Sequence, residues 1–218
     1  MGNIYIALIH HPVVNRSGEV AASSVTGLDL HDLARAARTY GVAATFVVHP
    51  FPAQRRFVSQ VVGHFVSGPG RSLHPERGET LERQISIVSD LNEAVEEVEA
   101  REGRPPLLVG TSARDDQHGF SGHKMASYGA LRKRLRESPE PAMILFGTSW
   151  GLAPELMERI DLRLPPVLGD AGTYNHLSVR AAAAVILDRL LGDREAPGPS
   201  PAEKEQLAGK AGKEGATP

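Results

Sequence analysis

The sequence predicts one α/β domain built on a mostly parallel sheet with flanking helices. Short runs rich in β-branched and aromatic residues alternate along the chain with amphipathic segments of helical period, which is typical of parallel strands joined by helices. The 218 residues are 41% hydrophobic and 23% charged, which is ordinary for a globular protein with a substantial core. We find no internal repeat and no break in composition that would indicate a second folded domain.

The helices and strands are predicted from the spacing of apolar residues and from the capping and helix-breaking residues beside them. In the segment 28–41, Leu30, Leu33 and Ala37 recur at helical spacing before a glycine, and a second helix begins at Asp90, where a capping box is expected. A third helix is alanine-rich and opens on the polar turn at residues 174–178. Five buried strands are predicted at 4–9, 44–49, 85–88, 107–111 and 143–147.

Composition excludes several classes of protein. The chain has no cysteine, which rules out disulfides, thiolate catalysis and cysteine-ligated zinc. It has no apolar run of about 18 residues and begins without a basic leader, so we expect a cytoplasmic protein without a membrane span. The net charge of −2 argues against a general polyanion binder. Residues 193–218 are rich in Pro, Gly, Ala and charge, and we expect a disordered tail there after a domain at 1–192.

The unusual residues gather in four loops. These are "IHHPVVNRSGEV" (9–20), "TSARDDQHGFSGHK" (111–124), "GTSWGL" (147–152) and "GTYNHLS" (172–178). The first three follow predicted strands directly. Ligands in open α/β sheets bind beyond the carboxyl ends of the strands, so a site is expected where these loops meet.

The loops were compared with the motifs of two other kinds of site, for nucleotides and for serine hydrolysis. Neither the dinucleotide-binding motif nor the phosphate-loop motif occurs. The "GTSWG" stretch around Ser149 matches the nucleophile elbow of serine hydrolases, and Asp161 or Asp170 with His176 completes the order of a triad. However, the stretch from Ser149 to His176 is too short to place the acid and the histidine each after a further strand. A serine hydrolase therefore stays as an alternative.

The chain has nine histidines, which are common metal ligands. His10, His11, His31 and Asp32 lie near the first strand and helix, and His118 and His123 share a loop. No tight ligand spacing such as H-E-x-x-H occurs. We therefore expect no metal site.

Three segments together resemble the SPOUT class of S-adenosylmethionine-dependent RNA methyltransferases. "LFGTSWGLAPEL" (145–156) is similar to the second motif of that class, and "LPPVLGDAGTYNHLSVRAAAAVILDRLL" (164–191) to the third, while 28–42 has the outline of the first. With "HHPVVNRSGEV" and "TSAR", the pattern also resembles a small bacterial family of RNA methyltransferases over about residues 3–192. The resemblance implies a C-terminal deep trefoil knot, an arrangement that is rare among folds.

The resemblance also implies a site. Arg35 falls at the arginine of the first motif and is assigned to orient a phosphate or stabilise an oxyanion, because guanidinium is a poor base. His176 is assigned as the proton acceptor, and Ser178 belongs to the same catalytic turn. The residues implied to bind S-adenosylmethionine are Thr111, Ser112, Gly147, Gly151, Leu164, Pro166, Leu168, Asn175 and Leu177.

The implied partners are an RNA substrate, tRNA or rRNA, and a second copy of the chain in a homodimer. The motifs lack the glutamate and the S-x-N-x-S pattern frequent among ribose methyltransferases, so base methylation stays open beside 2′-O transfer. No separate RNA-binding domain is evident, although "YGALRKRLRE" (128–137) carries Arg132, Lys133, Arg134 and Arg136. A SPOUT-like protein that binds nucleotide or RNA without turnover is a further alternative.

Overall fold

The computed structural model describes residues 2–114, 124–170 and 174–193 of the chain. Its centre is a seven-stranded sheet in the order β5-β4-β1-β8-β6-β9-β7, in which every neighbouring pair is parallel. The α/β class with a mostly parallel sheet is therefore confirmed. Its strands are β1 (Ile4–Ile9), β4 (Ala44–Val48), β5 (Ile85–Val88), β6 (Leu107–Gly110), β7 (Lys124–Met125), β8 (Ala142–Gly147) and β9 (Leu162–Arg163).

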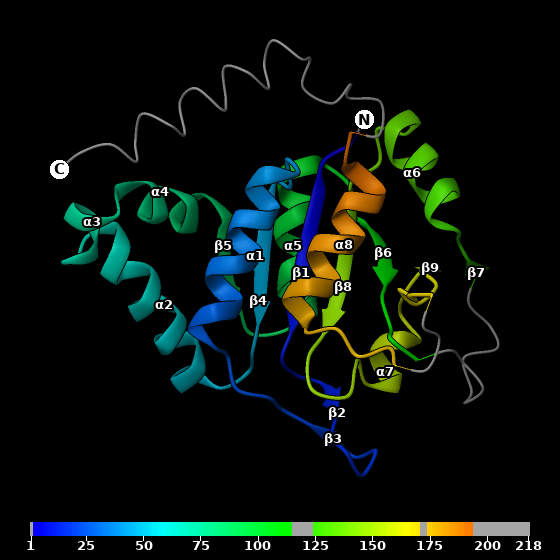
Figure 1. Cartoon of the computed structure of the whole chain (residues 1–218), viewed down its shortest axis with the longest axis horizontal. Coiled ribbons are helices and arrows are strands. Elements are labelled where there is room, and N and C mark those ends of the chain that lie inside the picture. Colours follow the sequence, from blue (N-terminus) through cyan, green and yellow to red (C-terminus); the bar gives the residue numbers. More distant parts are fainter. Residues whose placement is uncertain (1, 115–123, 171–173, 194–218) are drawn as a thin grey trace, which may run out of the picture.

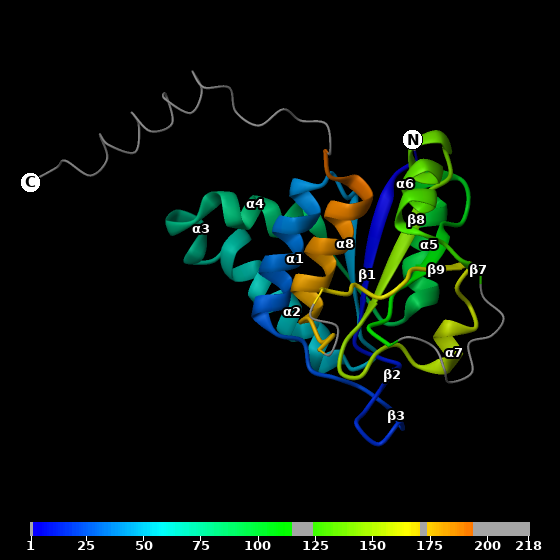
Figure 2. The ribbon, with the colours of Figure 1, turned by 45° about the vertical axis from the view of Figure 1, so that its right-hand side comes forward.

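Helices cover both faces of this sheet (Figure 1), and α1 and α8 lie side by side on one of them (Figure 2). A further helical segment, α2 to α4, extends beyond the β5 edge. The long helices are α1 (Gly27–Thr39), α2 (Pro52–Val66), α4 (Pro75–Gln84), α5 (Leu91–Glu102), α6 (Tyr128–Glu137) and α8 (Val179–Leu191), with short helices α3 (Gly70–Leu73) and α7 (Pro154–Met157). None of the helices described is long and apolar enough to cross a bilayer.

The central strand β1 is buried along its whole length because both of its faces are covered. Ile4, Ile6 and Leu8 pack into a core shared with α1, α6 and α8. The alternate residues, Tyr5 and Ala7 among them, pack against α5 on the opposite face. This two-sided burial explains why the strand is a continuous apolar run in the sequence.

A small hairpin adjoins the carboxyl edge of the sheet. It pairs β2 (Val13–Val14) with β3 (Val20–Ala21) in antiparallel register. An antiparallel bridge between Val13 and Leu152 ties this hairpin to the loop after β8. The loop after the first strand and the "GTSWGL" loop are thereby joined by backbone pairing.

The C-terminal part of the chain returns to the middle of the sheet. From β9, near one edge, it crosses back so that α8 packs between α1 and α6 over β8. Ala183 of α8 is fully buried there, as the close approach of these helices requires. This return is compatible with the knotted passage that the resemblance implies, and the knot itself stays a prediction.

Several elements differ from their prediction. The segment α2–α4 was not predicted, because α2 buries only Val58 and so carries a weak amphipathic pattern. At α5, Asp90 caps the helix as expected, but Glu93 accepts its hydrogen bond from the backbone N–H of Ser89 and not from Asp90. The expected tail lies almost wholly outside the described residues.

Candidate functional site

The loops singled out in the sequence meet at the carboxyl edge of the sheet. Leu164, which follows β9, donates its backbone N–H to the carbonyl of Gly110 at the end of β6. The Asn175 side-chain amide donates to the carbonyl of Ala113 at 2.6 Å, which joins the turn before α8 to the loop after β6. Segments more than 60 residues apart are thus held together at one edge, since the two bonded residues differ by 62 in number.

The loop after β8 folds back onto the strand that precedes it. A β-carbon at Gly147 would lie 2.5 Å from the backbone nitrogen of Leu152, so only glycine fits there. Gly151 has φ +110° and Ser149 has φ +54°, which turn the chain sharply. The need for glycine at position 147 therefore comes from the loop's own backbone.

The segments implied to bind the cofactor present both buried and exposed groups. Thr111 donates its hydroxyl to the carbonyl of Leu145 at 2.8 Å, and the hydroxyl of Ser112 accepts from the Arg114 N–H at 3.1 Å. Leu164 and Pro166 are buried. Leu168 is 59% exposed and Leu177 48% exposed, so both side chains are accessible to a ligand.

The polar turn before α8 has two distinct parts. The hydroxyl of Ser178 caps α8 by accepting the Ala181 N–H at 3.3 Å. His176 is exposed, and its ring packs edge-on against Tyr174 with 5.2 Å between centroids. Ser178 thus orients the helix, while the imidazole of His176 stays accessible at the surface.

A network of charges links α8 to α1, and it contains Arg35. Arg180, in the first turn of α8, donates to the buried carboxylate of Asp29 at 2.8 Å and lies 3.3 Å from a carboxylate oxygen of Asp32. Asp32 in turn accepts from Arg35 at 2.6 Å. Asp29 also accepts from the hydroxyl of Thr26, the N-cap of α1. The predicted substrate arginine is therefore coupled through Asp32 to Arg180, which follows the predicted catalytic turn in the first turn of α8.

Sequence reasoning missed Arg180. It follows Ser178 by two residues in an alanine-rich helix, and its charge alone could not distinguish it from a solvent-exposed residue. Asp29, by contrast, falls at the asparagine position of the first motif in the resemblance, which is the signal that could have pointed to this pair.

A second buried polar cluster lies where β1 ends. The hydroxyl of Thr148 donates to the carbonyl of Ile9, so the hydroxyl of Ser23 must donate to Thr148. Ser23 therefore accepts from Nδ1–H of His10 at 3.0 Å, which leaves Nε2 of His10 unprotonated. That nitrogen has no hydrogen-bond partner among the described residues, and the His10 side chain is fully buried.

Burial determines the protonation of this cluster. Desolvation, reinforced by the neighbouring His49, lowers the pKa of His10 to about 4. The two rings stack with centroids 5.9 Å apart. His49 accepts the Phe51 N–H on Nδ1 and donates from Nε2 to the carbonyl of Ser23, and burial lowers its pKa as well. His10 is consequently neutral at neutral pH.

The alternative sites receive no support from these contacts. Ser149 is exposed, and no hydrogen bond joins it to a histidine or a carboxylate among the residues described. Within the same residues, no group of three or more histidines and acids is arranged to hold a metal. His118 and His123 lie outside the described residues.

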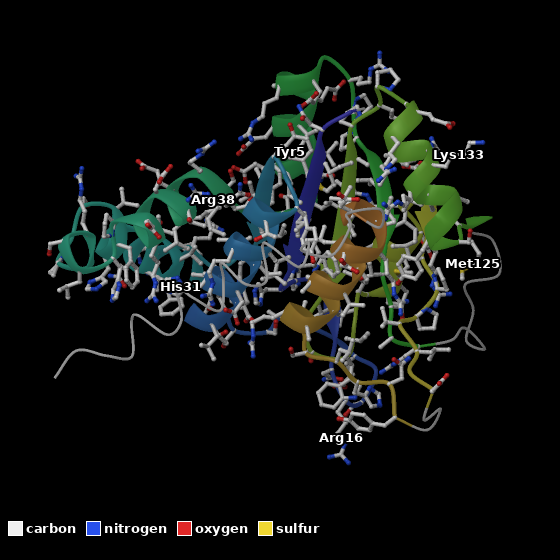
Figure 3. All side chains as sticks on the ribbon, turned by 45° about the horizontal axis from the view of Figure 1, so that its top comes forward. Tyr5, Arg16, His31, Arg38, Met125 and Lys133 are labelled. Carbon is white, nitrogen blue, oxygen red and sulfur yellow. The ribbon has the colours of Figure 1, made fainter. Side chains whose placement is uncertain are left out.

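The basic run on α6 has mixed roles. Arg132 donates to the carbonyls of Arg189 and Gly192, where it caps the C-terminus of α8. Arg134 pairs with Glu140 at 2.7 Å. Lys133 points outward from α6 (Figure 3). At least two of the four cations therefore have structural partners.

Comparison with known proteins identifies the family. Residues 3–192 match the model of a family described as SAM-dependent RNA methyltransferase, where SAM is S-adenosylmethionine. The chain belongs to this SAM-dependent RNA methyltransferase family. The chain is 42% identical over 191 residues to a tRNA (guanine-N(1)-)-methyltransferase of Oleidesulfovibrio alaskensis, and 39% identical over 188 residues to an uncharacterized protein of Aquifex aeolicus.

The two relatives differ in length. The match covers 88% of this chain but only 42% of the Oleidesulfovibrio protein, so the chain spans less than half of that relative. In contrast, it covers 86% of this chain and 88% of the Aquifex protein. The segment described here therefore makes up nearly all of one relative and a minority of the other.

Solved structures share the fold of this chain. A putative methylase family protein of Neisseria gonorrhoeae superposes with a TM-score of 0.55 at 17% identity, covering 97% of this chain and 94% of that one. TrmJ of Z. mobilis superposes with a TM-score of 0.53 at 14% identity, covering 98% and 78%. The SpoU methyltransferase AviRb of Streptomyces viridochromogenes gives 0.50 at 18%, covering 95% and 61%. The SPOUT fold expected from the motifs is confirmed, and S-adenosylmethionine is the methyl donor of the family.

Proposed function

We propose that this methyltransferase modifies a nucleotide of tRNA or rRNA at the point where the first turns of α1 and α8 meet the carboxyl ends of β6 and β8. The observation that carries the proposal is the chain of contacts from Arg35 through Asp32 and Arg180 to Asp29. It couples two segments that the family resemblance implicates, although they are far apart in the sequence. The Oleidesulfovibrio relative, a tRNA methyltransferase, is more than twice as long as the segment that matches this chain. The class of RNA is therefore part of the proposal.

The cofactor side of the site consists of the loops after β6, β8 and β9. S-adenosylmethionine supplies an electrophilic methyl group on a sulfonium. The exposed Leu168 and Leu177 suit the flat, apolar adenine, and the nearby backbone supplies polar groups for the ribose. The residues assigned to this side are Thr111, Ser112, Gly147, Gly151, Leu164, Pro166, Leu168, Asn175 and Leu177.

The substrate side consists of Arg35 and the turn before α8. Arg35 is 68% exposed at its side chain and retains donors beyond its bond to Asp32, so it can hold a phosphate or a developing oxyanion. His176 is exposed and can accept the proton that the nucleotide loses. Ser178 and Arg180 act as positioning residues, because their contacts with Ala181 and Asp29 fix α8 and its first turn. Holding the nucleotide in line with the methyl group contributes on the order of 7–11 kcal/mol to such reactions.

Transfer of tritiated methyl from S-adenosylmethionine tests this proposal. The purified chain is incubated with unmodified tRNA and rRNA transcripts, and cofactor affinity is measured in parallel by calorimetry. Arg35→Ala is expected to lower kcat/KM about hundredfold while leaving cofactor affinity unchanged. Arg83→Ala, which removes an exposed arginine of α4, serves as the matched control.

Two outcomes would contradict the proposal. If the wild-type chain binds both cofactor and RNA but transfers no methyl to any transcript, the alternative hypothesis of a binding protein without turnover is correct. If Arg35→Ala transfers methyl as fast as the control, the substrate side has been assigned to the wrong residues. We also propose a homodimer, for which light scattering after size exclusion must give twice the chain mass.

A further inference from the structure

A groove of about 450 Å³ lies between α1 and the α3–α4 segment. One wall consists of His31, Ala34 and Arg35 of α1, and the other of residues from Leu73 to Arg77 with Thr80 and Leu81. Figure 3 shows His31 on the side of α1 that faces the α2–α4 segment, where its ring meets Phe65 edge-on at 4.9 Å. The groove is thus built from two separate parts of the chain: one wall belongs to the segment that resembles the first motif, and the other belongs to none of the motifs.

The lining of the groove holds more basic than acidic side chains. It combines Arg35, Arg77, His31 and His74 with one carboxylate, Glu76, and with apolar side chains such as Ala34 and Leu81. The guanidinium of Arg77 lies 5.2 Å from the centroid of the Phe65 ring and has no ion pair among the described residues. Burial, and after it the positive charges of Arg77 and Arg35, lowers the pKa of His31, while the carboxylate of Asp32 acts in the opposite direction.

The position of the groove relates it to the methyl-transfer site. Arg35 belongs both to the groove wall and to the network that leads through Asp32 to Arg180 in the first turn of α8. One turn further along α1, Arg38 donates to Thr80 at 2.6 Å and pairs with Glu79, which ties α1 to α4 at that end. The groove therefore runs beside the site where Arg35 is proposed to meet the substrate.

We propose that this groove binds the phosphodiester backbone of the substrate RNA, next to the nucleotide that receives the methyl group. The inference rests on the proposed function. Two arginines on opposite walls match the oxygens of a phosphate, because guanidinium donates two parallel hydrogen bonds to it. The volume is that of a small-ligand site and suits one or two nucleotides, and not a duplex. Leu73, 76% exposed on the rim, adds an apolar surface for a ribose or a base.

The test compares RNA binding by the full chain and three variants. Binding of the RNA that the wild type methylates best, or of pooled tRNA transcripts, is followed by fluorescence anisotropy across a salt series. Arg77→Ala is expected to weaken binding about tenfold and to make the salt dependence shallower by about one phosphate contact. Arg83→Ala, on the same helix but paired only with Glu79, is expected to leave the affinity unchanged within about twofold.

A variant that improves binding guards against effects of misfolding. Glu76→Gln removes the one carboxylate of the groove and is expected to tighten RNA binding about threefold, since like-charge repulsion is relieved. A destabilised protein would not bind more tightly. Hydrogen exchange of peptides spanning α3 and α4 must also slow when RNA is added.

The outcomes separate this inference from the proposed function. If the wild type transfers methyl and Arg77→Ala binds RNA as tightly as the control, the groove does not bind RNA. The assignment of the chain as an enzyme is then unaffected. RNA binding that depends on Arg77 and Glu76 without any methyl transfer supports the groove and contradicts the proposed turnover. Failure of the wild type to bind RNA overturns the inference. Binding of 5′-AMP but not of RNA overturns it as well, because the groove would then accept only a free nucleotide.

Discussion

Acidification is predicted to destabilise the protein through His10. This histidine has an ordinary pKa of 6.5 in the unfolded chain and a pKa of about 4 in the folded one. As the pH falls below 6.5, the unfolded chain binds a proton that the folded chain does not bind until about pH 4. The free energy of unfolding must therefore fall across this window. At about 1.4 kcal/mol per pKa unit, the loss attributable to His10 is about 3 kcal/mol.

Urea denaturation between pH 7.5 and 4 measures this loss. The His10→Asn variant retains a donor for Ser23 but cannot titrate, so its unfolding free energy should vary less with pH by the same amount. His49 and His31 also have pKa values lowered by burial, and their contribution persists in both proteins. His176→Asn, which changes an exposed side chain, is the control. Parallel pH profiles for wild type and His10→Asn would refute the reasoning.

Three further predictions concern the site. Gly147→Ala places a β-carbon 2.5 Å from a backbone atom and should cost about 1–3 kcal/mol and weaken cofactor binding, whereas Gly129→Ala in open space should be neutral or stabilising; equal melting shifts would contradict this. A double-mutant cycle on unfolding free energies for Asp29→Asn and Arg180→Gln should give a coupling of about 1–2 kcal/mol, against about 0.5 or less for the exposed pair Arg101–Glu97; similar couplings would argue against a coupled network. Ser149→Ala should leave the rate of methyl transfer within about twofold of the wild type, and a fluorophosphonate should not label the wild type. Labelling at Ser149 would instead support the serine hydrolase alternative.

Most of the strands were predictable because they are short apolar runs, fully buried in β1 and largely half-buried in β5. The run at 4–9 coincides with β1, and 85–88 coincides with β5, since their apolar content and flanking breakers locate them without tertiary information. The cap of α5 was equally local, since the side chain of Asp90 satisfies N–H groups within three residues. The two-residue strands β7 and β9 were missed because they are defined by their pairing and not by a pattern of their own.

The family could be expected from ordered motifs, but the arrangement of the site could not. Arg35 and Ser178 are separated by most of the chain, and what relates them is the contact of Arg180 with Asp29 and Asp32. That contact depends on α8 returning from the edge of the sheet to lie against α1. The groove beside Arg35 likewise depends on the packing of the α3–α4 segment.

Local sequence was enough for the sheet-forming runs, the cap of α5 and the glycine-rich loops, because these depend on side-chain period and on backbone conformations that few residues adopt. Tertiary structure alone decided that His10 is buried and neutral, that Arg180 meets a buried carboxylate, and that a basic groove lies beside Arg35. Burial and charge pairing are properties of neighbours in space. They arise only when segments distant in the chain are brought together at one edge of the sheet.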